Sequence, residues 1–396
     1  MSIRPLRKEE MLAIKRLDAL CYNVPYNEKE VLNALDKQEN PEKGYWGFFN
    51  DQNLLESAVG CFTYDVFYQG KACKMAGIGG VVTSPEARRG GKVRQLLGTA
   101  LKEAYDKDCL FSTLYPFSHA FYEKFGYTLM NQQTNYKVPV DAFIPFAQKN
   151  TKIWSSQADT KKDIDDLVAF TDQFHSHFTI AAVSNQEYWK KTLPENPYDH
   201  GTYTYLIGEE GSQRPNAFIR FSSRFEEKEK NMFVSSLAFS SREGLQNCFA
   251  FFSAFFGQFR HVVFSLPTQV PVREMLSDPY RVEVFSRELP MGRVINPEKV
   301  LALLASKHPS LSLTIKVVDP FFSFAQGCWS IVQGEVKQNT ASQADCTMSI
   351  QSFSQVAMGA LTFRQVVYKP DILFSGEIAN FEKLFSCNPF YLTDTF

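Results

Sequence analysis

The sequence is short of the features that would place it in a membrane or on nucleic acid. Its 396 residues carry a formal net charge of −1, so no overall field draws the chain to nucleic acid or to a membrane surface. No segment reaches the roughly 20 apolar residues that a spanning helix needs. The charged start "MSIRPLRKEE" is unlike a signal peptide. We therefore expect a cytoplasmic protein with no membrane partner and no nucleic-acid partner.

Patterns typical of disulfide scaffolds and metal sites are also missing. The eight cysteines are scattered and none forms a CxxC pair, which fits free thiols in a reducing compartment. The nearest pair among the six histidines is His175 and His177, which would point away from each other on a helix. We therefore expect no metal site.

What the sequence does contain is enough apolar material for packed cores. Hydrophobic residues make up 44% of the chain and charged residues 21%, as in soluble globular proteins. The length favours two or three domains. Phenylalanine is unusually frequent, with 36 copies, which indicates aromatic cores or pockets without naming a function.

The first 148 residues predict an α+β unit. Two helices are expected within residues 8–36, separated at Pro25, with Asn27 as the cap of the second. Residues 45–83 have the turn signals of an antiparallel meander. Residues 92–106 are amphipathic with helical spacing, and 109–115 is a further strand. A strand–loop–helix–strand segment therefore lies at the centre of this unit.

Two more units are expected after the first. Residues 149–285 repeat the order meander, loop, helix and strand, but their loop, "FSSREGLQ", has one glycine and one arginine. We interpret this as a degenerate second copy, with a chance likeness in element order as the alternative. Residues 286–396 predict a third α+β unit, and the proline-containing segment 271–290 is the expected linker region.

The segment "SPEARRGGKVRQLL", residues 84–97, predicts an anion site where a strand meets a helix. The first amides of a helix have no intrahelical partner and lie at the positive end of its dipole. Gly90 and Gly91 allow a phosphate to approach the backbone, and the cations Arg88, Arg89, Lys92 and Arg94 add charge. The segment is neither a Walker loop nor a dinucleotide GxGxxG loop.

The pattern P-x-x-R-R-G-G-x-V-x-x-x-L after a V-V-T strand resembles the acetyl-CoA loop of the GNAT superfamily of N-acetyltransferases. Arg88 and Gly91 occupy the first two marked positions of its usual Q/R-x-x-G-x-G/A form, and Val93 replaces the last small residue. The resemblance implies acetyl-CoA as donor, with its diphosphate on the amides of the loop and its pantetheine arm along the preceding strand. The cofactor-binding residues would be Val81, Val82, Thr83, Arg88, Arg89, Gly90, Gly91, Lys92, Val93, Arg94, Phe117 and Ser118.

A second marker is "FSHAFYEKFGY", residues 117–127, which is typical of the same superfamily. The resemblance implies that Tyr122 is the general acid that protonates the departing CoA thiolate. It also implies that Phe117 and Ser118 help to position the thioester. The residues alone allow an equal alternative, in which Tyr122 is a core aromatic among Phe121, Phe125 and Tyr127.

The order of the three units resembles the Eis family of bacterial acetyltransferases, whose third domain is similar to sterol carrier proteins. The resemblance implies tandem GNAT folds, the second degenerate, followed by a sterol-carrier-like α+β domain. In that family the α-carboxylate of a terminal Phe is the general base, which here is Phe396. Apolar neighbours would desolvate it and make it a better base. A frayed terminus is the alternative, and Asp394 is the nearest competing side chain.

The implied reaction is direct transfer of an acetyl group from acetyl-CoA to a primary amine on a small molecule or peptide. An aminoglycoside or other polyamine-like acceptor is expected, in a wide pocket between the first and third units. The resemblance also implies the bacterial cytoplasm and a homo-oligomer, with hexameric rings typical of the family. Two alternatives remain: aminoacyl or peptidyl transfer on a double acetyltransferase fold, and a non-catalytic CoA- or lipid-binding protein with an apolar third domain containing "DPFFSFAQGCW".

Overall fold

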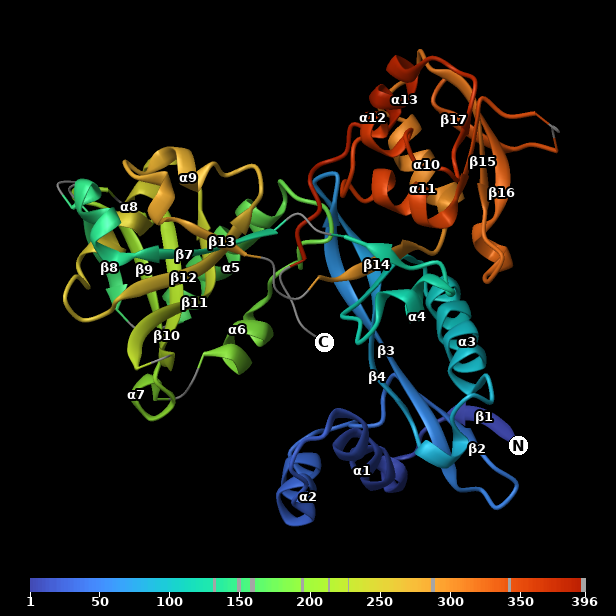
Figure 1. Ribbon diagram of the computed structural model, residues 1–396, viewed down its shortest axis with the longest axis horizontal. Helices are drawn as coiled ribbons and strands as arrows, with labels where there is room; N and C mark the ends of the chain where they lie inside the picture. Colours follow the sequence, from blue (N-terminus) through green and yellow to red (C-terminus); the bar gives the residue numbers. More distant parts are fainter. Residues whose placement is uncertain are drawn as a thin grey trace.

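The computed structural model describes residues 1–130, 133–147, 151–156, 161–193, 196–212, 214–226, 228–285, 289–340 and 343–392. Within these ranges the chain forms three α+β units, which are built on two seven-stranded sheets and one five-stranded sheet. The first unit lies at the lower right of Figure 1, the second at the left and the third at the upper right. The fold is therefore the tandem α+β arrangement that the sequence predicts.

The first sheet has the order β1-β2-β3-β4-β5-β14-β6. Four helices, two of them before the meander, accompany this sheet. The elements are β1 (Ser2–Pro5), α1 (Met11–Tyr22), α2 (Glu28–Asp36), β2 (Tyr45–Phe49), β3 (Leu55–Tyr68), β4 (Lys71–Thr83), α3 (Lys92–Asp106), β5 (Cys109–Leu114), α4 (His119–Glu123), β6 (Thr128–Leu129) and β14 (Met291–Val294).

Local sequence signals account for most of this unit. The Asn27 side chain caps α2 by accepting the amides of Lys29 and Glu30 at 3.1 and 3.4 Å. Helix α3 buries the apolar stripe that its spacing predicts, formed by Leu96, Leu97, Ala100, Leu101 and Ala104. The two predicted helices, the meander, the amphipathic helix and the strand after it are thus confirmed.

Strand β14 is the element of this sheet that sequence reasoning missed. It follows the second unit in the chain, yet it lies between β5 and β6 and pairs antiparallel with both, for example Arg293 with Ser112 and Gly292 with Thr128. In Figure 1 this orange strand runs among the teal strands of the first unit. Its four residues carry no pattern that names a partner more than 150 positions away in the sequence. Residues 291–294, which follow the expected linker and were counted with the third unit, are therefore a strand of the first sheet.

The second sheet has the order β13-β7-β12-β11-β10-β9-β8. Its strand β7 lies within the 1–148 range expected for the first unit, and β13 lies within the expected linker. The elements are β7 (Gln133–Pro139), β8 (Thr151–Ser156), α5 (Lys161–His175), α6 (Gln186–Thr192), α7 (Pro197–His200), β9 (Thr202–Glu209), β10 (Ala217–Glu226), β11 (Glu229–Phe239), α8 (Arg242–Ser253), β12 (His261–Pro267), α9 (Val272–Met275) and β13 (Glu283–Phe285).

The third unit has a sheet of order β17-β16-β15-β18-β19 and four helices, and its core is continuous with that of the first unit. One buried cluster contains Leu97 and Phe111 of the first unit together with Ile350 and Phe353 of the third. The elements are α10 (Pro297–Ala305), β15 (Ser312–Val318), β16 (Gly327–Val332), β17 (Glu335–Gln338), β18 (Cys346–Ser349), α11 (Ile350–Ala357), α12 (Phe363–Val366), β19 (Leu373–Phe374) and α13 (Ile378–Leu384).

His175, at the end of α5, makes the stability of the second unit sensitive to acid. Its Nδ1 lies 2.7 Å from the carbonyl oxygen of Ala182, and burial lowers the pKa of the ring to about 4. An unfolded histidine has a pKa of about 6.5, so the unfolded chain binds a proton first as the pH falls. Stability is therefore present above pH 6.5 and is lost progressively towards pH 4, by about 3 kcal/mol at most.

We expect the difference in Tm between the wild type and His175→Asn to shrink as the pH falls from 7.5 to 4.5, because the variant lacks the group that titrates. Thermal unfolding followed by circular dichroism measures it. The control is His177→Asn, since His177 is exposed two residues further on. Parallel Tm curves for the wild type and His175→Asn would contradict the assignment.

Candidate active site

Strands β4 and β5 part in the middle of the first sheet and open a cavity. They pair in parallel only as far as Ile78 and Leu114, and from there to Thr83 β4 is paired with β3 but not with β5. A bulge in the pairing of β3 with β4, between Ala58 and Gly60, lies at the level where β4 and β5 part. Beyond this point the backbone groups of β4 that face β5 are no longer taken up by that strand. The gap therefore offers a strand edge to an extended ligand.

A cavity of about 510 Å³ occupies this opening and reaches the loop before α3. It brings together most of the residues predicted to bind the cofactor, although Val82 and Ser118 are not among those that line it. Its lining is Cys21, Tyr22, Val81, Thr83, Ala87, Arg88, Arg89, Gly90, Gly91, Lys92, Val93, Arg94, Phe117, Phe121 and Phe125.

The start of helix α3 is open towards this cavity. Gly91 is its N-cap residue, with a φ of 71° and no side chain that caps the helix. A Cβ at Gly91 would meet no atom within 4 Å, so the space beside the first amides is free of protein. Arg89 also adopts a left-handed conformation, with a φ of 66°, which turns the loop into the helix. The loop thus has the geometry of an anion site.

The four predicted cations of the loop divide into two pairs. Lys92 Nζ is turned inward, 3.2 Å from the carbonyl of Ala87 and 3.3 Å from Glu56 Oε2. The guanidinium of Arg94 lies over the ring of Phe321 in the third unit, 4.9 Å from its centroid. Lys92 and Arg94 therefore make contacts within the protein, whereas Arg88 and Arg89 are exposed in the lining of the cavity.

The end of β4 is braced by side chains that the sequence analysis did not select. The Tyr22 hydroxyl donates to the carbonyl of Val81 at 3.3 Å, and Ser57 Oγ donates to that of Val82 at 2.8 Å. The side chain of Val82 is buried in the cluster beneath α1 and its carbonyl is taken up by Ser57, which accounts for its absence from the lining of the cavity. Tyr22 closes α1 and faces the opening, a position that follows from the contact of α1 with β4 and not from local sequence.

Tyr122 lies on α4 and is 3% exposed. Its ring makes edge-to-face contacts with Phe117, Phe121 and Tyr127, with centroids 5.4, 5.1 and 6.2 Å away. Burial raises the pKa of its phenol well above the usual value, so the hydroxyl keeps its proton at neutral pH. The structure thus places Tyr122 in an aromatic cluster, whose members Phe117 and Phe121 line the cavity whereas Tyr122 itself does not; its role as general acid stays a prediction.

Phe396 and Asp394, the two expected candidates for the base, lie outside the described residues. The described chain ends at Leu392, whose carbonyl accepts a hydrogen bond from Gln133 Nε2. Just before it, the backbone N–H of Tyr391 donates to the carbonyl oxygen of Thr179 in the second unit at 2.9 Å, and the ring of Tyr391 packs on that of Phe178. The segment that leads to the terminus is thus fixed at the junction of the first and second units.

A second cavity, of about 500 Å³, lies at this junction. It occupies the opening between β11 and β12, which pair in parallel only at two positions, and it reaches Tyr115 at the end of β5. The acceptor pocket was expected between the first and third units, whereas the lining of this cavity comes mostly from the second unit, with Tyr115 and Met130 of the first and Phe390, Tyr391 and Leu392 of the terminal segment. Its described lining contains one charged residue with a permanent charge, Arg224, and no aspartate or glutamate.

The helix start of the second unit differs from that of the first. Ser241 caps α8 by accepting the amide of Gly244 at 3.2 Å. A Cβ on Gly244 would lie 2.3 Å from the carbonyl oxygen of Asn216, so the helix start is covered by protein. The loop that we interpreted as degenerate therefore lacks the open amides of its counterpart before α3.

Two further observations, on membrane-spanning helices and on metal sites, apply to the described residues only. Within those ranges no helix is long and apolar enough to cross a membrane. Nor does any group of three or more histidine, cysteine, aspartate or glutamate side chains there have an arrangement that would hold a metal ion.

Comparisons with known proteins agree with the fold. Residues 2–130 match the family model of the acetyltransferase (GNAT) domain, and residues 297–393 match that of the sterol carrier protein domain. A search of curated proteins finds no match.

Solved structures resemble the whole chain. A GCN5-related N-acetyltransferase from Anabaena variabilis is 16% identical with a TM-score of 0.80, and Eis1 from Mycobacterium abscessus is 16% identical with a TM-score of 0.79; each comparison covers 100% of both chains. A probable N-acyltransferase of unknown function from Enterococcus faecalis is 18% identical, with a TM-score of 0.81 over 100% of this chain and 99% of that one. Residues 2–130 are therefore similar to the acetyltransferase (GNAT) domain and residues 297–393 to the sterol carrier protein domain, with a second GNAT-like unit between them, and the chain as a whole has the fold of solved GCN5-related N-acetyltransferases.

Proposed function

We propose that the protein is an acetyl-CoA-dependent N-acetyltransferase that acts on a primary amine. The observation that carries the proposal is the single cavity in which the open start of α3, the free edge of β4 and the Tyr122 helix meet. An acyl-CoA needs these three features together: a site for its diphosphate, an edge for its amide-containing arm and a proton donor for its sulfur.

The donor is held by the loop and by β4. The amides of residues 88–94 bind the diphosphate, and Arg88 and Arg89 add charge at the exposed rim. The backbone of Val81 and Thr83 pairs with the pantetheine arm and directs the thioester to the point where β4 and β5 part. Phe117, which is 66% exposed, covers the arm from the other side. Orientation of the two substrates supplies much of the rate gain.

The chemistry is one acyl transfer with two proton movements. The amine nitrogen attacks the thioester carbonyl, the C–S bond breaks, and Tyr122 gives its proton to the sulfur. The α-carboxylate of Phe396, or a water that it holds, accepts the proton that the amine loses. Burial keeps the Tyr122 phenol protonated, as an acid must be before it donates, but the raised pKa also makes it a weaker acid, so the acid role rests on the position of Tyr122 against Phe117 and Phe121 in the wall of the cavity.

The acceptor site is proposed in the cavity between the first and second units. Its wall carries several polar side chains, among them Gln133, Asn135 and Ser265, and Tyr115 links it to the end of β5 near the thioester. A polycation such as an aminoglycoside needs negative charge, which the described lining lacks. A peptide or small amine that binds by hydrogen bonds suits these walls better. The homo-oligomer and the bacterial cytoplasm implied by the resemblance remain predictions.

A panel of amines distinguishes an enzyme from a carrier. We expect free thiol to be released from acetyl-CoA when a good acceptor is present, with neutral amines and peptides preferred over aminoglycosides. A thiol-reactive dye follows the reaction. A protein that binds CoA or lipid without catalysis would release no thiol with any acceptor.

Replacing Arg88 and Arg89 by Gln should weaken binding of CoA roughly tenfold, because two charge-assisted contacts to phosphate are removed. The loss should shrink as salt is raised, since the charges are exposed and screened. Isothermal titration calorimetry at low and high salt measures both effects. The control is Arg242→Gln, which changes the matching exposed arginine at the covered start of α8. An equal loss in the control would contradict the loop as the phosphate site.

Tyr122→Phe should lower kcat about 100-fold, because the general acid is removed, and should leave the Kd for CoA nearly unchanged.

Deleting Phe396 should also lower kcat, since it moves the terminal carboxylate back by one residue. Phe396→Leu keeps that carboxylate and an apolar side chain, and is expected to stay near the wild type. Steady-state kinetics with CoA titrations test both residues; wild-type kcat after Tyr122→Phe would exclude the acid role.

A further inference from the structure

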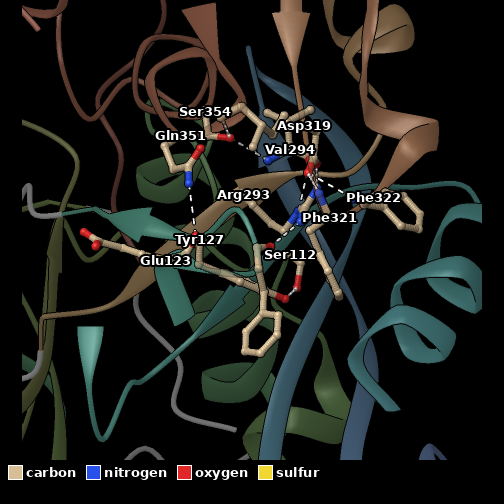
Figure 2. A network of polar contacts seen from close by, with 12 residues as sticks. Ser112, Glu123, Tyr127, Arg293, Val294, Asp319, Phe321, Phe322, Gln351 and Ser354 are labelled. Atoms are coloured by element: carbon tan, nitrogen blue, oxygen red, sulfur yellow. Dashed lines mark hydrogen bonds and ion pairs between the residues drawn. The ribbon is translucent and has the colours of Figure 1, made fainter. Parts of the chain in front are cut away.

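Arg293 carries a positive charge and is fully buried, so its position needs a physical explanation. It lies on β14, and its side chain has 0% exposure, as does that of its partner Asp319 in the third unit. A buried ion pair contributes little net stability compared with an apolar pair of similar volume, because both charges lose their hydration. The two terminal nitrogens of its guanidinium donate to two different segments of the chain (Figure 2).

One guanidinium nitrogen of Arg293 hydrogen-bonds to the third unit, and the other hydrogen-bonds to the turn that follows α4, the helix that carries Tyr122. Nη2 donates to Asp319 Oδ2, and Nη1 donates to the carbonyl oxygen of Phe125. Asp319 is itself fixed, because its Oδ1 accepts the amides of Phe321 and Phe322 at 2.9 and 3.0 Å. The ion pair therefore connects a loop of the third unit to a backbone atom three residues after Tyr122.

The turn is shaped to receive the arginine. Gly126 has a φ of 81°, and a Cβ there would lie 2.7 Å from Arg293 Nη1. Any other residue would be strained and would push the guanidinium away from the Phe125 carbonyl. The next residue, Tyr127, is also held, through a hydrogen bond of 2.7 Å between its hydroxyl and Ser112 Oγ on β5.

A second contact from the third unit holds the end of the same short helix. Gln351 Nε2 on α11 donates to the carbonyl oxygen of Glu123 at 3.0 Å, as Figure 2 shows beside Arg293. Helix α4 has five residues, from His119 to Glu123, so Tyr122 is its penultimate residue. A helix this short has little stability of its own and takes its position from its neighbours.

The loop of Asp319 also touches the cofactor helix. The ring of Phe321 packs edge-to-face on that of Phe125, with centroids 5.0 Å apart, and carries the guanidinium of Arg94 over its face. One loop of the third unit therefore contacts both α3, which begins at the cofactor loop, and the segment that carries Tyr122.

We propose that Arg293 and Gln351 are positioning residues for the proposed proton transfer, and that through them the sterol-carrier-like unit fixes the Tyr122 hydroxyl relative to the sulfur of the donor. This inference rests on the proposed function. A displacement of about 1 Å can cost a factor of 10² in rate, so a loosened α4 should reduce turnover more than binding.

Gln351→Met is the primary test, because it removes one hydrogen bond at a half-buried position and leaves no buried charge unpaired. We expect kcat to fall roughly tenfold, with the Kd for CoA and the Tm close to wild type. The control is Gln355→Met on the same helix, whose Nε2 donates to the carbonyl of Leu129 on β6 at 3.1 Å and whose Oε1 accepts from Lys369 Nζ at 2.9 Å, so that it loses more hydrogen bonds than Gln351→Met but none to α4. The control should keep wild-type kcat.

A double mutant separates positioning from general stability. In a Tyr122→Phe background, Gln351→Met should have no further effect on kcat, because the group that it positions is gone. A factor of ten in both backgrounds would show a role independent of Tyr122 and overturn the proposal. If Tyr122→Phe alone is without effect, the acid role of Tyr122 in the proposed function fails, and the positioning role with it; if Tyr122→Phe lowers kcat and Gln351→Met does not, only the positioning role fails.

Arg293→Lys tests the contribution of the guanidinium. Lysine keeps a cation beside Asp319, but it lacks the planar fork that reaches two acceptors at once. We expect a lowered kcat and a changed pH profile of kcat relative to wild type, with CoA binding retained in protein that is folded by circular dichroism. If the folded variant has wild-type kcat, the link from Arg293 to Tyr122 is excluded.

Discussion

The buried pair of Arg293 and Asp319 is the contact on which the relation between the first and third units depends. Taking two charges out of water costs several kcal/mol for each ion, and the cost is offset only where the remaining hydrogen-bonding groups are satisfied. Both ends meet that condition, since Asp319 accepts two amides and Arg293 donates to the carbonyl of Phe125. The pair therefore fixes one alignment of β14 against the Asp319 loop of the third unit, and it contributes more to the specificity of the fold than to its stability.

The two GNAT-like units differ where a helix begins, and this difference explains why one of them has an open anion site. Both have a pair of parallel strands that separate and a helix that follows the meander. In the first unit Gly91 leaves the start of α3 open, while in the second Ser241 and the carbonyl of Asn216 occupy the corresponding space at α8. The second unit keeps an opening between its strands, which supports a role in acceptor binding more than in donor binding.

Local signals in the sequence predicted the parts of the site that depend on neighbours in the chain. The cap at Asn27, the apolar stripe of α3 and the glycines before it are all short-range patterns, and each is found where expected. The contacts that position Tyr122 join residues about 170 to 230 places apart, such as Phe125 with Arg293 and Glu123 with Gln351. No periodicity or spacing encodes such pairings, because they arise from how β14 and α11 fit against the first sheet.

The segment "DPFFSFAQGCW" illustrates why composition alone left the third unit open to two interpretations. Its phenylalanines suit the wall of a lipid cavity as well as an ordinary phenylalanine-rich core. In the structure Phe321 contacts Phe125 and Arg94, and Phe324 lies 5.1 Å from the ring of Tyr105 on α3. These aromatic side chains are therefore used against the transferase unit, where they anchor the Asp319 loop. A ligand that entered this unit among them would have to loosen α3 and α4 together, so any carrier function and the transferase site would be coupled through the same loop.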